Sequence, residues 1–406
     1  MKVSLQDLAI FGGTSSFATP LHVGRPNIGD RAALRARMDE MLDRRWLTNG
    51  GPYVEEFEQR IASMLGVRHC VATSNATVAL EMAARALDMR GEVIIPSFTF
   101  IATAHALQWQ GITPIFCDID PRTHNIDPER VEALVTPRTS GVLGVHVWGR
   151  TCEVEALGAI AKRNGLRLLY DAAHAFGCSS HEGMIGSFGD AEVFSFHATK
   201  FVNAFEGGAV VTNDDSVAER VRLMKNFGFV DEDQVVYLGS NGKMSEASAV
   251  MGLTSLESME EFIAINHRNY RGYRRGLGDV PGVQVVACDA QQRHNYQYVV
   301  LEIDERVAGL SRDLLLQILR AENVLARRYF YPGCHRMEPY RTLFPNAGRT
   351  LPHTEALTAR VLLLPTGTAV GLKEVGSVCD IIRFAVENAS AIAARSGITD
   401  DRNAAS

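Results

Sequence analysis

The stretch "AEVFSFHATKFVNAFEGGAVV", residues 191–211, holds one lysine between two apolar runs rich in β-forming residues. Lys200 follows the first run, a Gly-Gly pair precedes the second, and His197 is the only other basic residue of the stretch. A lone lysine usually lies on a solvated face of a protein. Whether Lys200 does so depends on which other residues the fold brings to the same place.

The composition is that of an ordinary globular protein, with 406 residues, 46% hydrophobic and 22% charged. This length predicts two to three domains. The net charge of −6 gives no basic field for nucleic acid, and no apolar run approaches the roughly 20 residues that cross a membrane. The N-terminal sequence is a poor signal peptide, and seven scattered cysteines without a C-x-x-C do not indicate a disulfide framework. We expect a cytoplasmic protein without nucleic-acid or membrane partners.

Seven short runs in the first two-thirds of the chain have the composition of buried strands, and amphipathic segments separate several of them. Such alternation predicts an α/β domain with a mostly parallel, seven-stranded sheet covered on both faces. The runs are "VRHCVATS", "GEVIIPSF", "ITPIFCDI", "SGVLGVHVW", "LRLLYDAA", "AEVFSFHA" and "GGAVVTN".

The pattern changes near residue 245, where a long charged helical stretch begins and reaches about residue 277. The segments "GVQVVAC", "YQYVVLEI" and "LLLQILRAENV" follow and indicate a smaller α+β unit. We therefore predict a large domain over residues 1–255, a small C-terminal domain over 256–395 and a flexible tail over 396–406.

Ligands of parallel sheets bind outside the carboxyl ends of the strands, so the residues there are the first candidates for a site. The segment "ATSNAT", residues 72–77, lies between a predicted strand and a predicted helix. Its backbone N–H groups and the helix dipole could hold a phosphate. The alternative is a plain helix cap made by Thr73 or Ser74. The chain has no P-loop and no G-x-G-x-x-G motif, which argues against a nucleoside triphosphate or Rossmann dinucleotide site.

Two further strand ends carry Phe100, in "PSFTF", and Asp171, in "LLYDAAHAFG". Phe100 could belong to the core or stack on a planar ligand. Asp171 follows three apolar residues, so its carboxylate needs a partner such as a cationic ring nitrogen, unless it caps a helix. His174, three residues further on, could be structural; with no H-E-x-x-H or His/Cys cluster in the chain, we expect no metal site.

Lys200 occupies a fourth strand end, and apolar surroundings would lower its pKa and make the amine nucleophilic. A phosphate cradle, a stacking aromatic, a buried acid and a reactive lysine together fit one cofactor. Pyridoxal phosphate (PLP) uses a lysine for its aldehyde, an acid for its pyridinium nitrogen and a cradle for its phosphate.

The sequence also resembles the DegT/DnrJ/EryC1/StrS family of PLP-dependent sugar aminotransferases over essentially its whole length. The fold that this resemblance implies is that of a fold-type-I PLP aminotransferase. The matching segments are "WLTNGGPYVEEFE", "SNATVAL", "PSFTFIAT", "CDIDPRTHNID", "DAAHAFG", "FSFHATK", "EGGAVVTND", "GSNGKMSEASAVMGL", "RRYFYPGCHRMEPY" and "LLLPTG".

The resemblance implies a role for each matching residue at the cofactor ring. Lys200 matches the lysine that binds the cofactor covalently and later moves the proton. Asp171 matches the acid beside the pyridinium nitrogen. Phe100 matches an aromatic residue stacked on the ring, with Ala173 on the other face, and His174 matches a residue that reaches the phenolic oxygen.

Other matches concern the phosphate and the assembly. Asn75, Ala76 and Ser195 match phosphate contacts, and Asn241 matches a residue that reaches the phosphate from the neighbouring subunit. The resemblance therefore implies a homodimer with a shared active site. Lys200 stands where a dehydratase of the family has histidine, which favours amino transfer over dehydration.

The expected reaction is transfer of an amino group from L-glutamate to a nucleotide-linked keto-deoxysugar. His174 and the "HATK" segment at residues 197–200 resemble members that aminate C4 of dTDP-4-keto-6-deoxyglucose. Residues 46–51 and 327–331 are the expected walls of the sugar cavity. There are two alternatives. The enzyme could aminate C3, or the chain could be a non-catalytic PLP-fold protein that binds sugar nucleotides.

Overall fold

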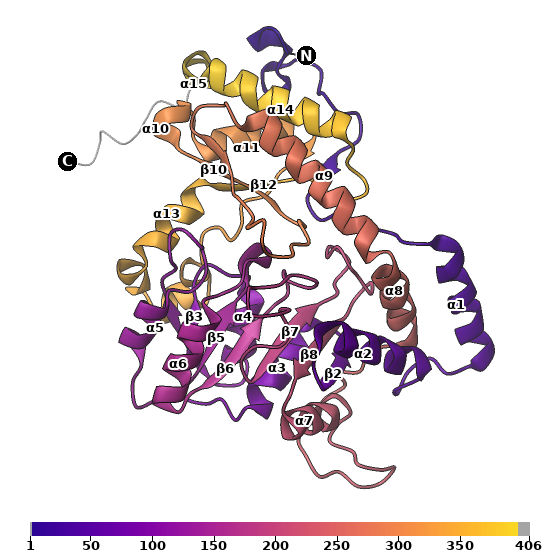
Figure 1. The fold of residues 1–406 in the computed structure, drawn as a ribbon. Helices are drawn as coiled ribbons and strands as arrows, with labels where there is room; N and C mark the ends of the chain where they lie inside the picture. The colour runs from indigo at the N-terminus through magenta and orange to yellow at the C-terminus, as the bar shows by residue number, and fades with distance from the viewer. Residues whose placement is uncertain (1, 397–406) are drawn as a thin grey trace.

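The computed structural model describes residues 2–396, and its largest feature is a seven-stranded sheet (Figure 1). The strand order is β2-β8-β7-β6-β5-β3-β4, and only β8 runs against the other six. The seven predicted runs are therefore strands of one mostly parallel sheet, as predicted. Their bounds are β2 His69–Thr73, β3 Glu92–Pro96, β4 Thr113–Cys117, β5 Thr139–Val145, β6 Arg167–Asp171, β7 Ala191–Ser195 and β8 Gly208–Thr212.

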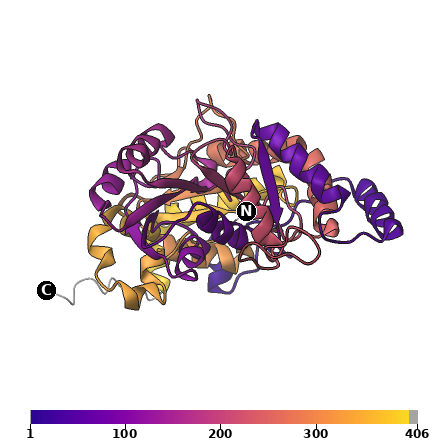
Figure 2. The ribbon, with the colours of Figure 1, turned by 90° about the horizontal axis from the view of Figure 1, so that it is seen from below.

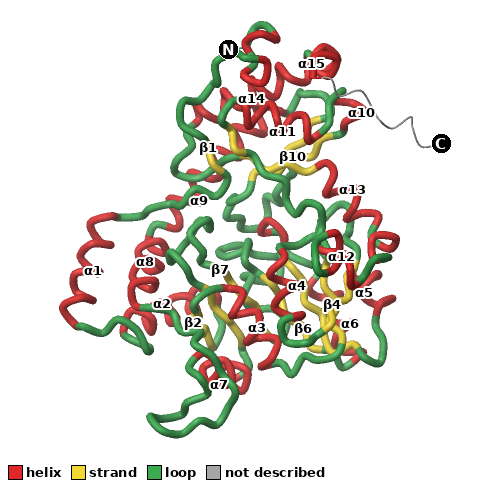
Figure 3. Tube along the Cα trace, turned by 180° about the vertical axis from the view of Figure 1, so that it is seen from behind, coloured by secondary structure: helices red, strands yellow, loops and turns green. Residues whose placement is uncertain are grey.

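Helices cover both faces of this sheet because side chains alternate along each strand. In β2, Val71 packs into the core on the face of α3, whereas Cys70 and Ala72 pack on the face of α2. Seen from behind, α3 and α4 lie across the strands (Figure 3). Helices α3 Ala76–Ala86, α4 Ile101–Gln108 and α7 Asp215–Lys225 lie on one face, and α2 Pro52–Leu65, α5 Pro128–Leu134, α6 Val154–Asn164 and α8 Glu246–Glu257 on the other.

The predicted helical stretch that ends near residue 277 consists of two helices. Helix α8 ends at Glu257 and α9 spans Met259–Leu277. Ser258 lies between them, and its carbonyl accepts the N–H of Phe262 in the first turn of α9. The charged sequence predicts helix on both sides of this break but does not mark the break itself.

A smaller three-stranded antiparallel sheet forms the upper part of Figure 1, with order β12-β10-β9. Strand β12 was not among the predicted strands. The bounds are β9 Val283–Val285, β10 Val299–Ile303 and β12 Val361–Leu364, and this part of the chain also contains α9, α10 Glu305–Ala308, α11 Arg312–Ala321, α13 Pro352–Arg360 and α14 Leu372–Glu387.

The N-terminal segment packs on this smaller unit. Strand β1, Leu21–His22, pairs in parallel with β11, Val324–Leu325, and Leu8 belongs to the core of the smaller unit. Helix α1, Arg31–Arg44, then extends at one edge of the molecule (Figures 1 and 2). Domain limits at 255 and 395 stay a prediction.

Two further helices belong to the C-terminal third of the chain, α12 Tyr340–Leu343 and α15 Ala389–Ser396. The predicted tail starts at residue 396, where α15 ends, and residues 397–406 lie outside the described range. No described helix combines the length and the apolar character needed to span a membrane.

Candidate active site

A cavity of about 640 Å³ opens at the carboxyl ends of the parallel strands, where the topology predicts a ligand site. Eight of the nine candidate residues line it, and they lie at the carboxyl ends of four different strands or in the segments that follow them. These eight are Asn75, Ala76, Phe100, Asp171, Ala173, His174, Ser195 and Lys200.

Lys200 lies just beyond β7, in a turn where its N–H donates to the carbonyl of His197 (2.8 Å). Its Nζ donates to the hydroxyl of Tyr298 at 3.4 Å. Burial lowers the pKa of Lys200 to about 8, and the carboxylate of Asp171 offsets part of this effect. The interpretation of Lys200 as a solvated lysine is therefore wrong, and the amine has the lowered pKa that a nucleophilic lysine requires.

Asp171 ends β6, and both of its carboxylate oxygens accept hydrogen bonds. Oδ1 accepts from the N–H of Ala173 (3.0 Å), and Oδ2 accepts from the hydroxyl of Thr103 (2.9 Å), which in turn contacts Thr99 (2.8 Å). No helix begins after β6, so Asp171 caps a turn and not a helix. Burial raises the pKa of Asp171, although these hydrogen bonds and Lys200 oppose the shift. A cation close to this carboxylate would favour its charged form.

His174 is held as a neutral imidazole. Its Nδ1 lies 3.3 Å from the backbone N–H of Trp148, which donates to it. Burial, with a smaller effect of Lys200, lowers the pKa of His174 well below its usual value. Nδ1 accepts in a neutral ring, so Nε2 carries the proton and can donate to an oxyanion in the cavity. The ring of Phe330 stacks on His174, with centroids 5.6 Å apart.

The first turn of α3 forms an anion cradle. Asn75, not Thr73 or Ser74, caps this helix, because its Oδ1 accepts from the N–H of Val78 (3.0 Å). The N–H groups of Ala76 and its neighbour lie in the first turn, where a helix offers them no acceptor. The side chain of Asn75 is thus used by the cap, and the backbone is left for the phosphate.

The remaining predicted residues complete a cavity that fits PLP. Ser195 accepts the N–H of His197 at its Oγ (3.4 Å), so its own O–H can donate into the cavity. Phe100 is 59% exposed although it is a large aromatic residue on the cavity wall. A planar ligand would cover this ring, and the small side chain of Ala173 leaves room for one.

Three functional contacts were missed by the sequence reasoning. Tyr298 contacts Lys200, Thr103 holds Asp171, and the backbone of Trp148 fixes the tautomer of His174. All three lie in segments already quoted as strands or motifs, but which residues they contact follows from tertiary packing.

Asn241 does not line the cavity of its own chain. It is exposed on the loop that follows α7 and bridges to Asn226. Of the expected cavity walls, Arg327, Tyr329 and Phe330 line the cavity, whereas residues 46–51 do not.

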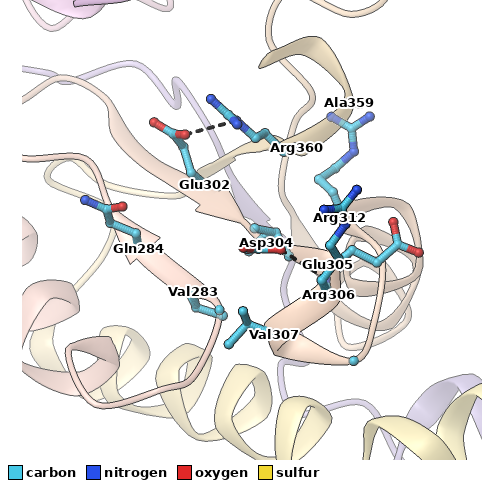
Figure 4. A pocket seen from close by; sticks show the side chains of 13 residues that line it. Val283, Gln284, Glu302, Asp304, Glu305, Arg306, Val307, Arg312, Ala359 and Arg360 are labelled. Atoms are coloured by element: carbon cyan, nitrogen blue, oxygen red, sulfur yellow. Dashed lines mark hydrogen bonds and ion pairs between the residues drawn. The ribbon is translucent and has the colours of Figure 1, made fainter. Parts of the chain in front are cut away.

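A larger hollow, of about 950 Å³, lies in the smaller unit but has paired charges (Figure 4). Glu302 contacts Arg360 at 3.1 Å, and Asp304 caps α10 by accepting the N–H of Arg306. Among the described residues, no group of three or more His, Cys, Asp or Glu side chains is arranged to hold a metal ion. The chemistry therefore concentrates at the cavity around Lys200.

The sequence matches the DegT/DnrJ/EryC1/StrS aminotransferase family over residues 30–383. It is 38% identical over 348 residues to the dTDP-4-amino-4,6-dideoxy-D-glucose transaminase of Shigella dysenteriae. The aligned region covers 85% of this chain and 94% of that relative. Among solved structures, DesI in the presence of its TDP-sugar product has a TM-score of 0.92 and 54% identity, covering 97% of this chain and 100% of DesI. DesV of S. venezuelae, solved with a ketimine intermediate, has a TM-score of 0.82 and 29% identity, covering 88% and 95%.

Proposed function

Because the chain belongs to the DegT/DnrJ/EryC1/StrS aminotransferase family, we propose that its cavity aminates a nucleotide-linked keto-deoxysugar at C4. The chain is a PLP-dependent sugar aminotransferase. This excludes the alternative of a non-catalytic PLP-fold protein that only binds sugar nucleotides. The proposed substrate is dTDP-4-keto-6-deoxy-D-glucose, the product is dTDP-4-amino-4,6-dideoxy-D-glucose and the donor is L-glutamate.

The observation that carries the proposal is the joint placement of Lys200, Asp171 and His174 around one cavity. PLP supplies an aldehyde for the amine and a ring that accepts electrons. In our proposal Lys200 holds the cofactor and moves a proton between it and the substrate carbon. Asp171 keeps the ring nitrogen protonated, and the Nε2–H of His174 donates to the phenolic oxygen.

The phosphate and ring contacts follow the same proposal. The backbone N–H groups of Asn75, at the cap of α3, and of Ala76, in its first turn, hold the phosphate together with the hydroxyl of Ser195. Phe100 and Ala173 enclose the two faces of the ring. Each of these residues lines the cavity. Asn241 completes the phosphate site from the second subunit of a homodimer.

The choice of C4 depends on the narrower similarity. A relative named as a dTDP-4-amino-4,6-dideoxy-D-glucose transaminase supports it, and the 54% identity with DesI, solved with its TDP-sugar product, supports a TDP-sugar as the substrate class. Arg327, whose guanidinium lies 5.1 Å from the ring of Tyr329, is the cavity residue that we propose for the pyrophosphate. Amination at C3 is the alternative, since one cofactor can face either carbon.

The test is incubation with dTDP-4-keto-6-deoxyglucose, PLP and L-glutamate, followed by NMR of the product. We expect an amine at C4, and glutamate alone should convert the bound cofactor to pyridoxamine phosphate. The Lys200→Ala variant should keep the fold and lose nearly all turnover. An amine at C3, or consumption of only a 3-keto isomer, would contradict the proposal; appreciable transamination by Lys200→Ala would contradict the role of the lysine.

A further inference from the structure

A hollow of about 820 Å³ lies along α9 and shares no lining residue with the active-site cavity, and we call it the α9 hollow. Its helical wall carries four exposed arginines, Arg268, Arg271, Arg274 and Arg275. Spacings of three, four and seven residues place these side chains along one side of the helix. Figure 1 shows α9 on the outside of the molecule, between α8 and α14.

The four positive charges have no acidic partner in the part of the chain that the structure describes. Arg271 and Arg275 make no hydrogen bond or ion pair with any described residue. Arg268 reaches only the neutral amide oxygen of Asn269 (3.2 Å), and the guanidinium of Arg274 lies over a tyrosine ring. No Asp or Glu is among the described residues that line the hollow.

The grouping of these arginines, and not the lack of an acid alone, sets them apart. Some other exposed arginines lie against acids, as Arg383 does with Asp279 and Arg220 with Asp88 (2.7 Å). Others, such as Arg90 and Arg349, are exposed without an acidic partner among the described residues but stand at scattered positions. In the hollow of Figure 4, Arg360 lies against Glu302, and two further acids, Asp304 and Glu305, line the wall. A group of four unpaired cations on a chain of net charge −6 creates a local positive potential that only a bound anion would neutralise.

The neighbouring histidine is consistent with such a potential. Burial and the charge of Arg271 both lower the pKa of His267. His267 stacks on Tyr296, with ring centroids 4.4 Å apart, and Tyr270 forms part of the same wall. The hollow thus combines an aromatic wall with a rim of guanidinium groups.

We propose that the α9 hollow binds the polyphosphate group of a small molecule. Guanidinium groups match phosphate oxygens with paired N–H donors, and a volume of this size is typical of small-molecule sites. The charge of a triphosphate, about −4 at neutral pH, balances the four arginines. The site does not depend on the proposed transamination.

The test is calorimetric titration of the PLP-loaded protein with inorganic tripolyphosphate and, separately, with ATP. We expect saturable binding with one equivalent per chain, weakened as salt increases. The double variant Arg271→Glu, Arg275→Glu should lose at least tenfold in affinity. The matched control is Arg90→Glu, Arg349→Glu, which makes the same charge change at exposed arginines elsewhere and should change affinity less than threefold.

Several results would overturn the proposal. Equal binding by the α9 variant and the wild type would place the anion elsewhere, and equal weakening by both double variants would reveal only a general charge effect. Tighter binding of an oligonucleotide than of tripolyphosphate would indicate a nucleic-acid surface. Preference for ATP over tripolyphosphate would support the proposal and assign the aromatic wall a role in binding the base. Circular dichroism and retained aminotransferase activity show that the variants fold.

Discussion

At the scale of single residues, the site depends on two ionisable groups whose burial has opposite consequences. Burial lowers the pKa of Lys200 and raises that of Asp171, so each shift favours the neutral form. A neutral amine suits a nucleophile, whereas a neutral acid could not stabilise a ring cation. The hydrogen bonds from Thr103 and Ala173 oppose the second shift and leave Asp171 ready for a cationic partner.

The lowered pKa of Lys200 predicts how fast the apoprotein captures PLP. Only the neutral amine reacts, so the rate should rise with pH up to about 8 and level off above 9, where nearly all the amine is neutral. A lysine with its usual pKa of about 10.4 would continue to gain about sevenfold between pH 9 and 10. Stopped-flow absorbance at several pH values measures the rate, and a continued rise above pH 9 would contradict the lowered pKa. Asp171→Asn removes the charge that opposes the shift and should move the plateau to lower pH.

Asp171→Asn should also lower kcat strongly, by about 100-fold or more, because the ring nitrogen loses its charged partner. The amide keeps an oxygen for the N–H of Ala173, so the turn and the fold should persist. Steady-state kinetics and circular dichroism measure the two effects. Thr103→Val, which keeps the carboxylate but removes the bond to its Oδ2 (2.9 Å) together with the contact to Thr99, is the milder control. Near-wild-type activity of Asp171→Asn would mean that Asp171 only caps its turn.

The sequence predicts the residues that line the site better than the residues that hold them in place. Lys200 and Asp171 each follow an apolar run, so their burial can be read from their neighbours. Tyr298 and Thr103 contact them from distant segments, through the packing of β10 and α4. The choice of Asn75 as helix cap depends on where α3 begins, and a sequence leaves that uncertain by a residue or two.

At the scale of elements, the phosphate cradle depends on the close approach of β8 to the start of α3. Gly208 lies in β8, paired with Thr73 at the end of β2. A Cβ at Gly208 would lie 2.5 Å from the carbonyl carbon of Asn75 and 2.6 Å from the nitrogen of Ala76. Both are backbone atoms, so a side chain there would displace the first turn of α3.

Gly208→Ala should therefore weaken PLP binding, by about tenfold, and lower the melting temperature, since overpacking of this kind costs about 1–3 kcal/mol. Gly158→Ala is the matched control, because no atom lies within 4 Å of its added Cβ in α6. That change should leave cofactor affinity unchanged and stabilise the helix slightly. Fluorescence titration of the apoprotein with PLP and thermal melting measure both variants. Unchanged affinity in Gly208→Ala would mean that the start of α3 does not hold the phosphate.

Elements of the large sheet were predicted well because each strand is a short run of buried residues between turns. Strand β12 and the break between α8 and α9 were not. Val361–Leu364 follows α13 directly and carries no turn signal before it. Ser258 is compatible with a helix interior, so only the packing of α9 on the smaller unit reveals the change of direction.

At the scale of the whole molecule, the loop after α7 carries features of a subunit interface. It projects from the body in Figures 1 and 3. Phe227, Val235 and Leu238 are exposed on it, together with Asn241. Exposed apolar side chains grouped on one projecting loop are typical of a surface that a partner covers. A second copy of the chain is the partner that we propose, with Asn241 entering the other cavity.

A shared site can be tested by mixing two inactive or weakened variants. Asn241→Ala should bind PLP more weakly, and Lys200→Ala should be inactive. If Asn241 acts across the interface, each mixed dimer has one cavity with both lesions and one cavity with neither. Random mixing in equal amounts makes about half of the dimers mixed. Each mixed dimer has one intact cavity, so about a quarter of all cavities in the mixture are intact. The activity of the mixture, at limiting PLP, should then exceed the mean of the two separate preparations. If Asn241 acts within its own chain, every cavity carries a single lesion, and the mixture should equal that mean. A monomer with full activity at assay concentration would also contradict the shared site.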